Sequence, residues 1–200
     1  MAATEPLKPA LRFAPETLLA AQGTAAEGDI GVKVCFFDVD GVLTDGRLWI
    51  SGEGESVKAF HALDGHGLKL LVQGGITPVV ITGRDSPAVR RRVADLGLAH
   101  AHYGVADKHR VAQAVLDGLS LQWAHAAAMG DDWPDLPLLT RVAFACVPPQ
   151  AHAEVRAVAH HITQAPAGAG AVRECCDLLL MANGRYGALL NGHLTTLDAR

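Results

Sequence analysis

Two aspartates spaced two residues apart follow an apolar run and could carry out phosphoryl transfer. Asp38 and Asp40 come directly after the apolar run 32–37, and Gly41 follows them. Two neighbouring carboxylates at the edge of a sheet are costly unless a cation or hydrogen bonds compensate their charge. One carboxylate could attack phosphorus as a nucleophile. The other could give a proton to the leaving oxygen and take one from the hydrolytic water, and Gly41 would let the chain turn so that both side chains point inward.

Three further groups of polar residues follow later apolar runs. Thr82 and Arg84 offer a hydroxyl and a guanidinium to phosphate oxygens. Lys108 offers an ammonium that could neutralise a phosphate or the nucleophile. Asp131 lies in an acidic run, with Asp132 and Asp135 near it, that could complete an oxygen site for a hard cation such as Mg²⁺. Each group alone is a weak signal, but four groups in this order indicate one site.

Alternating strand-like and helix-like runs must position these groups. We expect strands at 32–37, 78–81, 99–103, 124–129 and 142–147, and helices at 67–72, 87–96, 108–116 and 134–139. This alternation predicts a parallel sheet with right-handed crossovers and helices on both faces, which is a three-layer α/β Rossmann-like fold. Active sites of such sheets lie at the carboxyl ends of the strands, where the polar groups fall.

A β-hairpin is expected to interrupt the alternation. Residues 47–50 and 57–60 read as short strands around the Gly-rich segment 51–55, so they predict a flap beside the end of the first strand. The intervals between the motifs are filled by this hairpin and the expected helices and strands, which leaves no room for a cap domain. We expect an N-terminal appendage at 1–31, with a short helix at 15–22 and a linker at 23–31, a catalytic domain at 32–181 and a C-terminal tail at 182–200.

Composition and charge favour a cytoplasmic protein that acts on a small molecule. The net charge of −4 argues against nucleic acid as the main partner, although it leaves room for a local anion site. No apolar run reaches the roughly 20 residues of a membrane helix. The four cysteines lack C-x-x-C spacing and are expected to be buried, reduced thiols. The chain also lacks H-E-x-x-H and P-loop motifs.

Taken together, the motifs resemble those of the haloacid dehalogenase (HAD) superfamily. The sequences DVDGV at 38–42, TGR at 82–84, Lys108 and GDDWPD at 130–135 carry the resemblance, and Asp40 is typical of the phosphatases among them. Longer segments are similar to the 3-deoxy-D-manno-octulosonate 8-phosphate (KDO 8-phosphate) phosphatases of that superfamily. These are DVDGVLTDG at 38–46, KAF at 58–60, DGHG at 64–67, ITGR at 81–84 and GAVRECCDLLL at 170–180.

The resemblance implies roles for particular residues. Asp38 would be the nucleophile and a Mg²⁺ ligand, Asp40 the general acid and base with its backbone carbonyl on the metal, and Asp131 the remaining protein ligand. Thr82 and Lys108 would hold the phosphoryl group. The implied substrate contacts are Asp40, Lys108, His61, Ala62, Leu63, Asp64, Gly65, Lys69, Arg84 and Arg92. The resemblance also implies a homotetramer. Because no cap domain covers the site, we expect the hairpins to pair between subunits and to bury Trp49 and Ile50.

Three departures from the family pattern concern the substrate. Leu63 and Ala169 stand where family members often carry arginines, and His61 stands where an asparagine is common. The leading expectation is hydrolysis of KDO 8-phosphate, a step toward lipopolysaccharide. A phosphatase for another sugar-acid phosphate, such as a nonulosonate 9-phosphate, is the alternative within the class. A catalytically silent scaffold subunit is the alternative of another class, and the full set of acids argues against it.

Overall fold

A parallel six-stranded sheet forms the centre of the protein. The structure, a computed structural model, describes residues 6–23 and 31–195. The strands lie in the order β5-β4-β1-β6-β7-β8, and every neighbouring pair is parallel. Their bounds are β1 Val34–Phe37, β4 Thr77–Ile81, β5 His100–His102, β6 Ala126–Met129, β7 Phe144–Val147 and β8 His161–Ile162. The expected α/β fold is confirmed, and β8 is a strand that the sequence reading missed.

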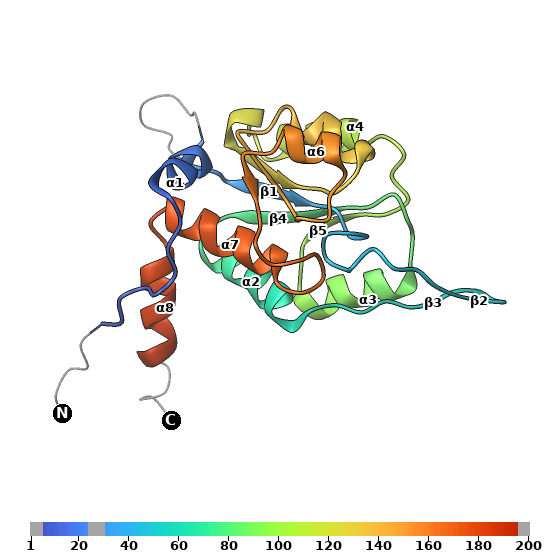
Figure 1. Cartoon of the computed structure of the whole chain (residues 1–200), viewed down its shortest axis with the longest axis horizontal. Coiled ribbons are helices and arrows are strands. Elements are labelled where there is room, and N and C mark those ends of the chain that lie inside the picture. The colour runs from blue at the N-terminus through green and yellow to red at the C-terminus, as the bar shows by residue number, and fades with distance from the viewer. Residues whose placement is uncertain (1–5, 24–30, 196–200) are drawn as a thin grey trace.

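Helices cover both faces of this sheet (Figure 1). On one face lie α2 (Ala62–Gln73), α3 (Pro87–Leu96) and α7 (Ala171–Ala182), and on the other lie α4 (Lys108–Gly118), α5 (Leu136–Leu139) and α6 (Ala153–Ala157). Short 3₁₀ turns, η1 (Trp123–His125) and η2 (Trp133–Asp135), flank β6. The helix expected at 134–139 is thus a 3₁₀ turn followed by one turn of α-helix.

The residues of β1 show why the sheet is covered on both sides. Cys35 and Phe37 pack into the core beneath α2 and α7, whereas Val34 and Phe36 pack into the core beneath α4 and α5. All four are at most 1% exposed. A continuous apolar run is typical of a parallel strand buried on both faces, since successive side chains point in opposite directions.

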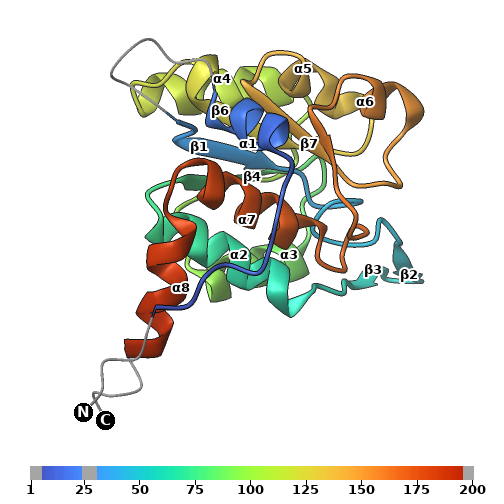
Figure 2. The ribbon, with the colours of Figure 1, turned by 60° about the vertical axis from the view of Figure 1, so that its left-hand side comes forward.

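The segments on either side of the expected catalytic domain also form helices. Helix α1 (Pro15–Gln22) contacts α7 and β7, and Ala21 is fully buried there. Helix α8 (Tyr186–Thr195) lies in the expected C-terminal tail and contacts α7 (Figure 2). Most of the expected linker at 23–31 lies outside the described residues. The boundaries at 31 and 181 remain a prediction.

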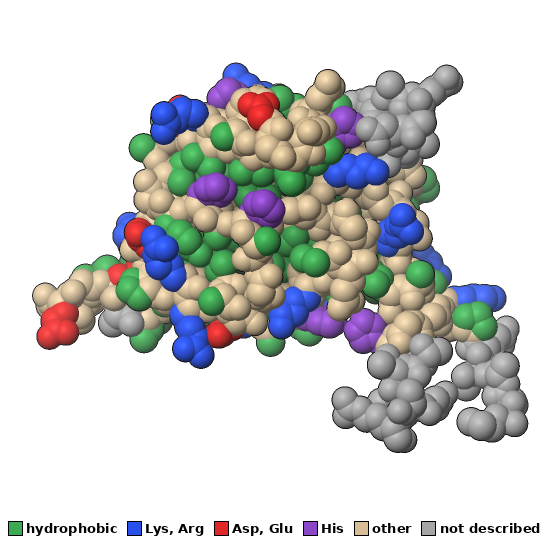
Figure 3. All heavy atoms as spheres, turned by 180° about the vertical axis from the view of Figure 1, so that it is seen from behind, with side chains coloured by type: hydrophobic (Ala, Val, Ile, Leu, Met, Phe, Trp, Pro, Cys, Tyr) green, Lys and Arg blue, Asp and Glu red, His purple; other side chains and the backbone are tan. Residues whose placement is uncertain are grey.

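The expected hairpin is present and projects from the body of the molecule (Figures 1 and 3). Strand β2 (Trp49–Ser51) pairs antiparallel with β3 (Gly54–Val57). The two strands lie closer to the tip of the hairpin than expected. Ser51 pairs with Gly54, and Ile50 pairs with Glu55, on either side of a turn at Gly52 and Glu53. The hairpin carries Trp49 and Ile50, which are 54% and 64% exposed. None of the described helices is long and apolar enough to cross a membrane.

Candidate active site

The ends of three adjacent strands bring the sequence motifs together. Asp38 follows β1, Thr82 follows β4 and Asp131 lies just after β6. Strand β1 pairs with β4 on one side and β6 on the other, and the Asp38 amide donates to the carbonyl of Met129 at 3.0 Å. The later strands are added in opposite directions on the two sides of β1. In an open α/β sheet, a crevice forms at the carboxyl ends of the strands at such a point.

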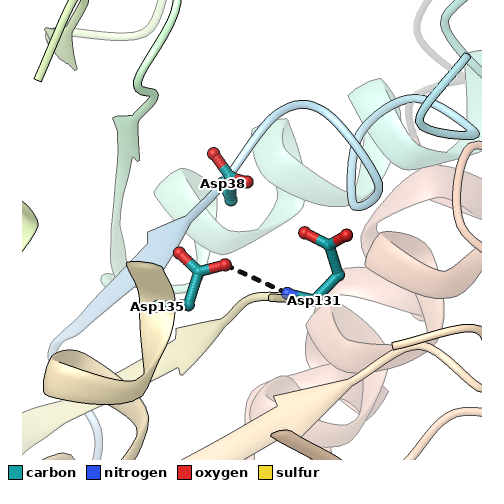
Figure 4. Close-up of side chains that lie close together, drawn as sticks. All are labelled: Asp38, Asp131 and Asp135. Atoms are coloured by element: carbon teal, nitrogen blue, oxygen red, sulfur yellow. Dashed lines mark hydrogen bonds between the residues drawn. The ribbon is translucent and has the colours of Figure 1, made fainter. Parts of the chain in front are cut away.

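Three carboxylates converge at this edge (Figure 4). One oxygen from each of Asp38, Asp131 and Asp135 lies within 4.8 Å of the others. Asp135 is fixed by accepting the amide of Asp131 at 3.1 Å and the ammonium of Lys108 at 2.6 Å. The sequence reading placed Asp135 near the site without giving it a part in it. In the sequence, Asp135 lies four residues after Asp131 with a proline between them. This spacing indicates a tight turn that could return Asp135 to the carboxylate cluster.

The crowding of these carboxylates changes their acidity. Burial, and then the negative charge of Asp135, raises the pKa of Asp38 to about 6, although Lys108 partly opposes the rise. Burial, and then the charges of Asp38 and Asp135, raises the pKa of Asp131 to about 7. A divalent cation would relieve this repulsion, and carboxylate oxygens are the ligands that Mg²⁺ prefers. The donor set therefore fits a hard divalent cation.

Lys108 supplies the positive charge of the cluster. Its side chain is 6% exposed, and its ammonium lies 2.9 Å from Asp38 and 2.6 Å from Asp135. Burial alone would lower the pKa of Lys108, but the two carboxylates outweigh burial and hold it above its ordinary value. Lys108 is therefore charged at neutral pH, at the point where an anion would approach Asp38.

Gly41 allows the loop after Asp38 to approach Asp131. Its φ is +88°, and a Cβ at this position would lie 2.1 Å from a carboxylate oxygen of Asp131. A side chain would therefore both strain the backbone and displace one of the three carboxylates.

A cavity of about 440 Å³ opens beside the cluster. Six of the expected site residues line it, which are Asp38, Asp40, Thr82, Arg84, Lys108 and Asp131. Thr82 is 1% exposed, and its hydroxyl accepts the amide of Arg84 at 3.3 Å. The guanidinium of Arg84 is half exposed and lies 3.7 Å from Asp40. The cavity thus combines acids with hydroxyl and cationic groups that are suited to phosphate.

The side chain of Asp40 contacts a residue at the base of the hairpin. Its Oδ1 accepts a hydrogen bond from the ammonium of Lys58, whose side chain is 1% exposed. The sequence reading used Lys58 only as part of a resemblance. No spacing rule pointed to it, because the two residues are 18 positions apart.

The other expected substrate contacts do not line this cavity. Residues 61–65 lie at the start of α2, Lys69 lies further along the same helix, and Arg92 on α3 donates to the carbonyl of His61 at 3.4 Å. Asp64 is 1% exposed and caps α7, since its oxygens accept the amides of Gly170 at 3.2 Å and Arg173 at 2.8 Å. Asp64 therefore helps to hold α7 in place, and its expected contact with the substrate stays a prediction.

Comparison with known proteins identifies the family. No family model matches the chain. A 3-deoxy-D-manno-octulosonate 8-phosphate phosphatase from Yersinia pestis is 35% identical over 154 residues, which cover 77% of this chain and 82% of the relative. The chain belongs to the KDO 8-phosphate phosphatase family. Solved structures place this family in the HAD superfamily, because a HAD hydrolase from Legionella pneumophila is 37% identical with a TM-score of 0.81 over 90% of this chain and 94% of its own.

One structural neighbour of this phosphatase family was solved with ligands. The KDO 8-phosphate phosphatase from Moraxella catarrhalis is 36% identical and superposes with a TM-score of 0.80 over 88% of this chain and 96% of its own. It was crystallised with a magnesium ion, a phosphate ion and KDO. The expected HAD fold is thus confirmed both by the sheet and by its relatives.

Proposed function

We propose that the chain is a Mg²⁺-dependent phosphatase that hydrolyses KDO 8-phosphate to KDO and phosphate. The observation that carries the proposal is the meeting of Asp38 with a buried cation, Lys108, and with two further carboxylates, at a cavity that Asp40 also lines. Family membership gives the reaction class and names the substrate of the relatives.

The reaction would proceed in two steps through Asp38. A carboxylate oxygen of Asp38 attacks phosphorus, and the bond from phosphorus to the sugar oxygen breaks with its electron pair staying on that oxygen. Asp40 gives a proton to the sugar oxygen, which leaves as an alcohol. Water then attacks the phosphorus of the aspartyl phosphate and gives a proton to Asp40. The bond to Asp38 breaks, phosphate leaves, and both aspartates return to their starting states.

The remaining groups would hold the reacting phosphate. Asp38, Asp131 and the backbone carbonyl of Asp40 would bind Mg²⁺, with Asp135 also within reach of it. Bound Mg²⁺ would offset the charge of the carboxylates and of the phosphoryl oxygens. Lys108 and Thr82 would hold the phosphoryl group in line with Asp38.

The identity of the sugar acid would depend on Arg84, which lines the cavity, and on residues that do not line it. We propose that Arg84 contacts the sugar acid directly, and that residues 61–65, Lys69 and Arg92 contribute to its recognition. Leu63 is 54% exposed and apolar where the family often has an arginine, and this favours a nonulosonate 9-phosphate as the second candidate. The intact carboxylate cluster argues against a silent scaffold.

We further propose that the chain forms a homotetramer through its hairpins. Leu48, Trp49, Ile50 and Val57 are between 39% and 64% exposed on this small element. An isolated two-stranded hairpin is marginally stable, and exposed apolar side chains gathered on one element mark an interaction surface. Hairpins packed against those of other subunits would wall each open site. The protein would act in the cytoplasm, on the route to lipopolysaccharide.

A phosphatase screen tests the function. Pure protein is offered KDO 8-phosphate, a nonulosonate 9-phosphate and common sugar phosphates, with Mg²⁺ or with EDTA. The proposal predicts Mg²⁺-dependent phosphate release with the highest kcat/KM for KDO 8-phosphate. A preference for the nonulosonate ester would assign the second candidate, and no release from any ester would favour the scaffold.

A further inference from the structure

A buried lysine at the base of the hairpin contacts the residue proposed as the general acid. The side chain of Lys58 is 1% exposed, and its ammonium donates to Asp40 Oδ1 and lies 3.1 Å from Oε2 of Glu55. A lysine is almost never so fully buried unless its charge is paired. Lys58 does not line the cavity, whereas Asp40 does. Lys58 therefore contacts the acid without lining the cavity.

Further polar contacts connect Lys58 through Glu55 to the body of the protein. Oε1 of Glu55 accepts a hydrogen bond from the hydroxyl of Ser86 at 2.7 Å. Ser86 is 4% exposed and lies at the N-terminus of α3, shortly after the loop that carries Thr82 and Arg84. Glu55 and Lys58 thus join the hairpin to Asp40 at one end and to α3 at the other.

Lys58 is the buried charged partner of the Asp40 side chain. Among the described residues, a second charged partner of Asp40 is Arg84, whose side chain lies 3.7 Å from Oδ2 and is 52% exposed. An exposed arginine at that distance restrains a carboxylate weakly, because solvent screens the pair and the side chain is mobile. A buried, charge-assisted hydrogen bond restrains it strongly.

From this geometry we infer that Lys58 is a positioning residue that holds Asp40 in the orientation from which it donates a proton to the leaving oxygen. The inference rests on the proposed function, since it assumes that Asp40 is the general acid. Lys58 and Glu55 belong to the hairpin, so the same contact links the orientation of the acid to the placement of the flap. Catalytic groups must be held within a fraction of an ångström, and neighbouring hydrogen bonds usually supply that restraint.

The test uses two esters that differ in their need for an acid. The alkoxide leaving from a sugar phosphate needs a proton, whereas p-nitrophenolate leaves without one. The parameter kcat/KM reports the steps up to formation of the aspartyl phosphate, so it isolates the first proton transfer. Lys58→Met, which keeps the length of the side chain and removes its charge, should lower kcat/KM for KDO 8-phosphate by about 10- to 100-fold. This loss is part of the roughly 10²–10⁴ that general acid–base catalysis contributes, and kcat/KM for p-nitrophenyl phosphate should fall less than about threefold.

A double-mutant cycle adds a second readout. In an Asp40→Asn background, Lys58→Met should cause no further loss with KDO 8-phosphate, because Lys58 acts only through Asp40. Glu53→Gln, at the exposed tip of the same hairpin, is the matched control and should leave both substrates unchanged.

Each outcome decides the inference. If Lys58→Met lowers kcat/KM equally for both esters, or lowers it further in the Asp40→Asn background, Lys58 is a general structural residue and the inference is wrong. If Lys58→Met fails to fold, as judged by its thermal unfolding, Glu55→Gln takes its place. Glu55→Gln must then show a smaller loss confined to KDO 8-phosphate, and an equal loss for both esters overturns the inference. Wild-type protein that hydrolyses neither ester contradicts the proposed function instead.

Discussion

The carboxylate cluster should destabilise the metal-free protein, and removing one of its charges should stabilise it. Asp131 has a pKa of about 7 against an ordinary value of 3.8, with burial and the charges of Asp38 and Asp135 as the causes. The folded protein therefore holds a proton that the unfolded chain releases between these two pH values. The contribution of Asp131 to the stability is therefore largest below pH 3.8 and is lost as the pH rises toward 7.

The size of this effect follows from the same pKa. A rise from 3.8 to about 7 corresponds to about 4 kcal/mol at pH 8. Solvent screening at a partly exposed carboxylate reduces this figure to about 2 kcal/mol. For a protein of this size, Asp131→Asn should then raise the Tm by about 4–8 °C in EDTA at pH 8. The difference should shrink as the pH is lowered to 5.

Thermal unfolding followed by circular dichroism measures this prediction. Asp132→Asn is the control, since Asp132 is an exposed neighbour, and its effect should be much smaller. Saturating Mg²⁺ should reverse the order, because the wild type would bind the metal more tightly than Asp131→Asn and gain stability from it. A variant less stable than wild type in EDTA at pH 8, or a difference independent of pH, would refute the reasoning.

Three further predictions concern the loop after Asp38, the cap of α7 and the assembly. Gly41→Ala should raise the Mg²⁺ concentration for half-maximal activity at least about tenfold, because the new Cβ would meet Asp131. Gly52→Ala, with open space around it, is the control and should leave that concentration unchanged, so equal Mg²⁺ titrations of the two variants would contradict the prediction. Asp64→Ala should lower the free energy of unfolding, measured by urea denaturation, by about 1–2 kcal/mol, because two amides at the start of α7 lose their acceptor. An unchanged urea midpoint would show that the cap is dispensable. Trp49→Glu should dissociate the tetramer and lower kcat/KM, and light scattering that finds a fully active monomer in the wild type would rule out the assembly.

The sequence predicted the fold well where the physical signals are local. Continuous apolar runs marked the central strands, and proline at the start with glycine at the end bounded α3 as Pro87–Leu96. Strand β8 was missed because two residues, His161 and Ile162, carry no period. Helix α2 begins five residues earlier than expected, at Ala62, since Asp64 and Gly65 break the apolar pattern yet are buried against α3 and α7.

Part of the candidate site could likewise be predicted from local sequence signals, and part of it could not. The sequence predicted Asp38, Asp40, Thr82, Lys108 and Asp131 to meet, because each follows a strand and the strands' carboxyl ends share one edge. It could not find Lys58, whose burial depends on how the hairpin returns to Asp40. It could not find that Asp64 caps α7 either, because the two amides that Asp64 accepts lie more than a hundred positions away along the chain.

The central claim is that Asp38 is the nucleophile, and the turnover of Asp38→Asn tests it most directly. Phosphate release from KDO 8-phosphate is measured for Asp38→Asn and wild type at saturating Mg²⁺, with circular dichroism to show that both are folded. An amide is a poor nucleophile, so the variant should be slower by roughly 10⁴-fold or more. A folded Asp38→Asn variant that retains near-normal turnover would contradict the account.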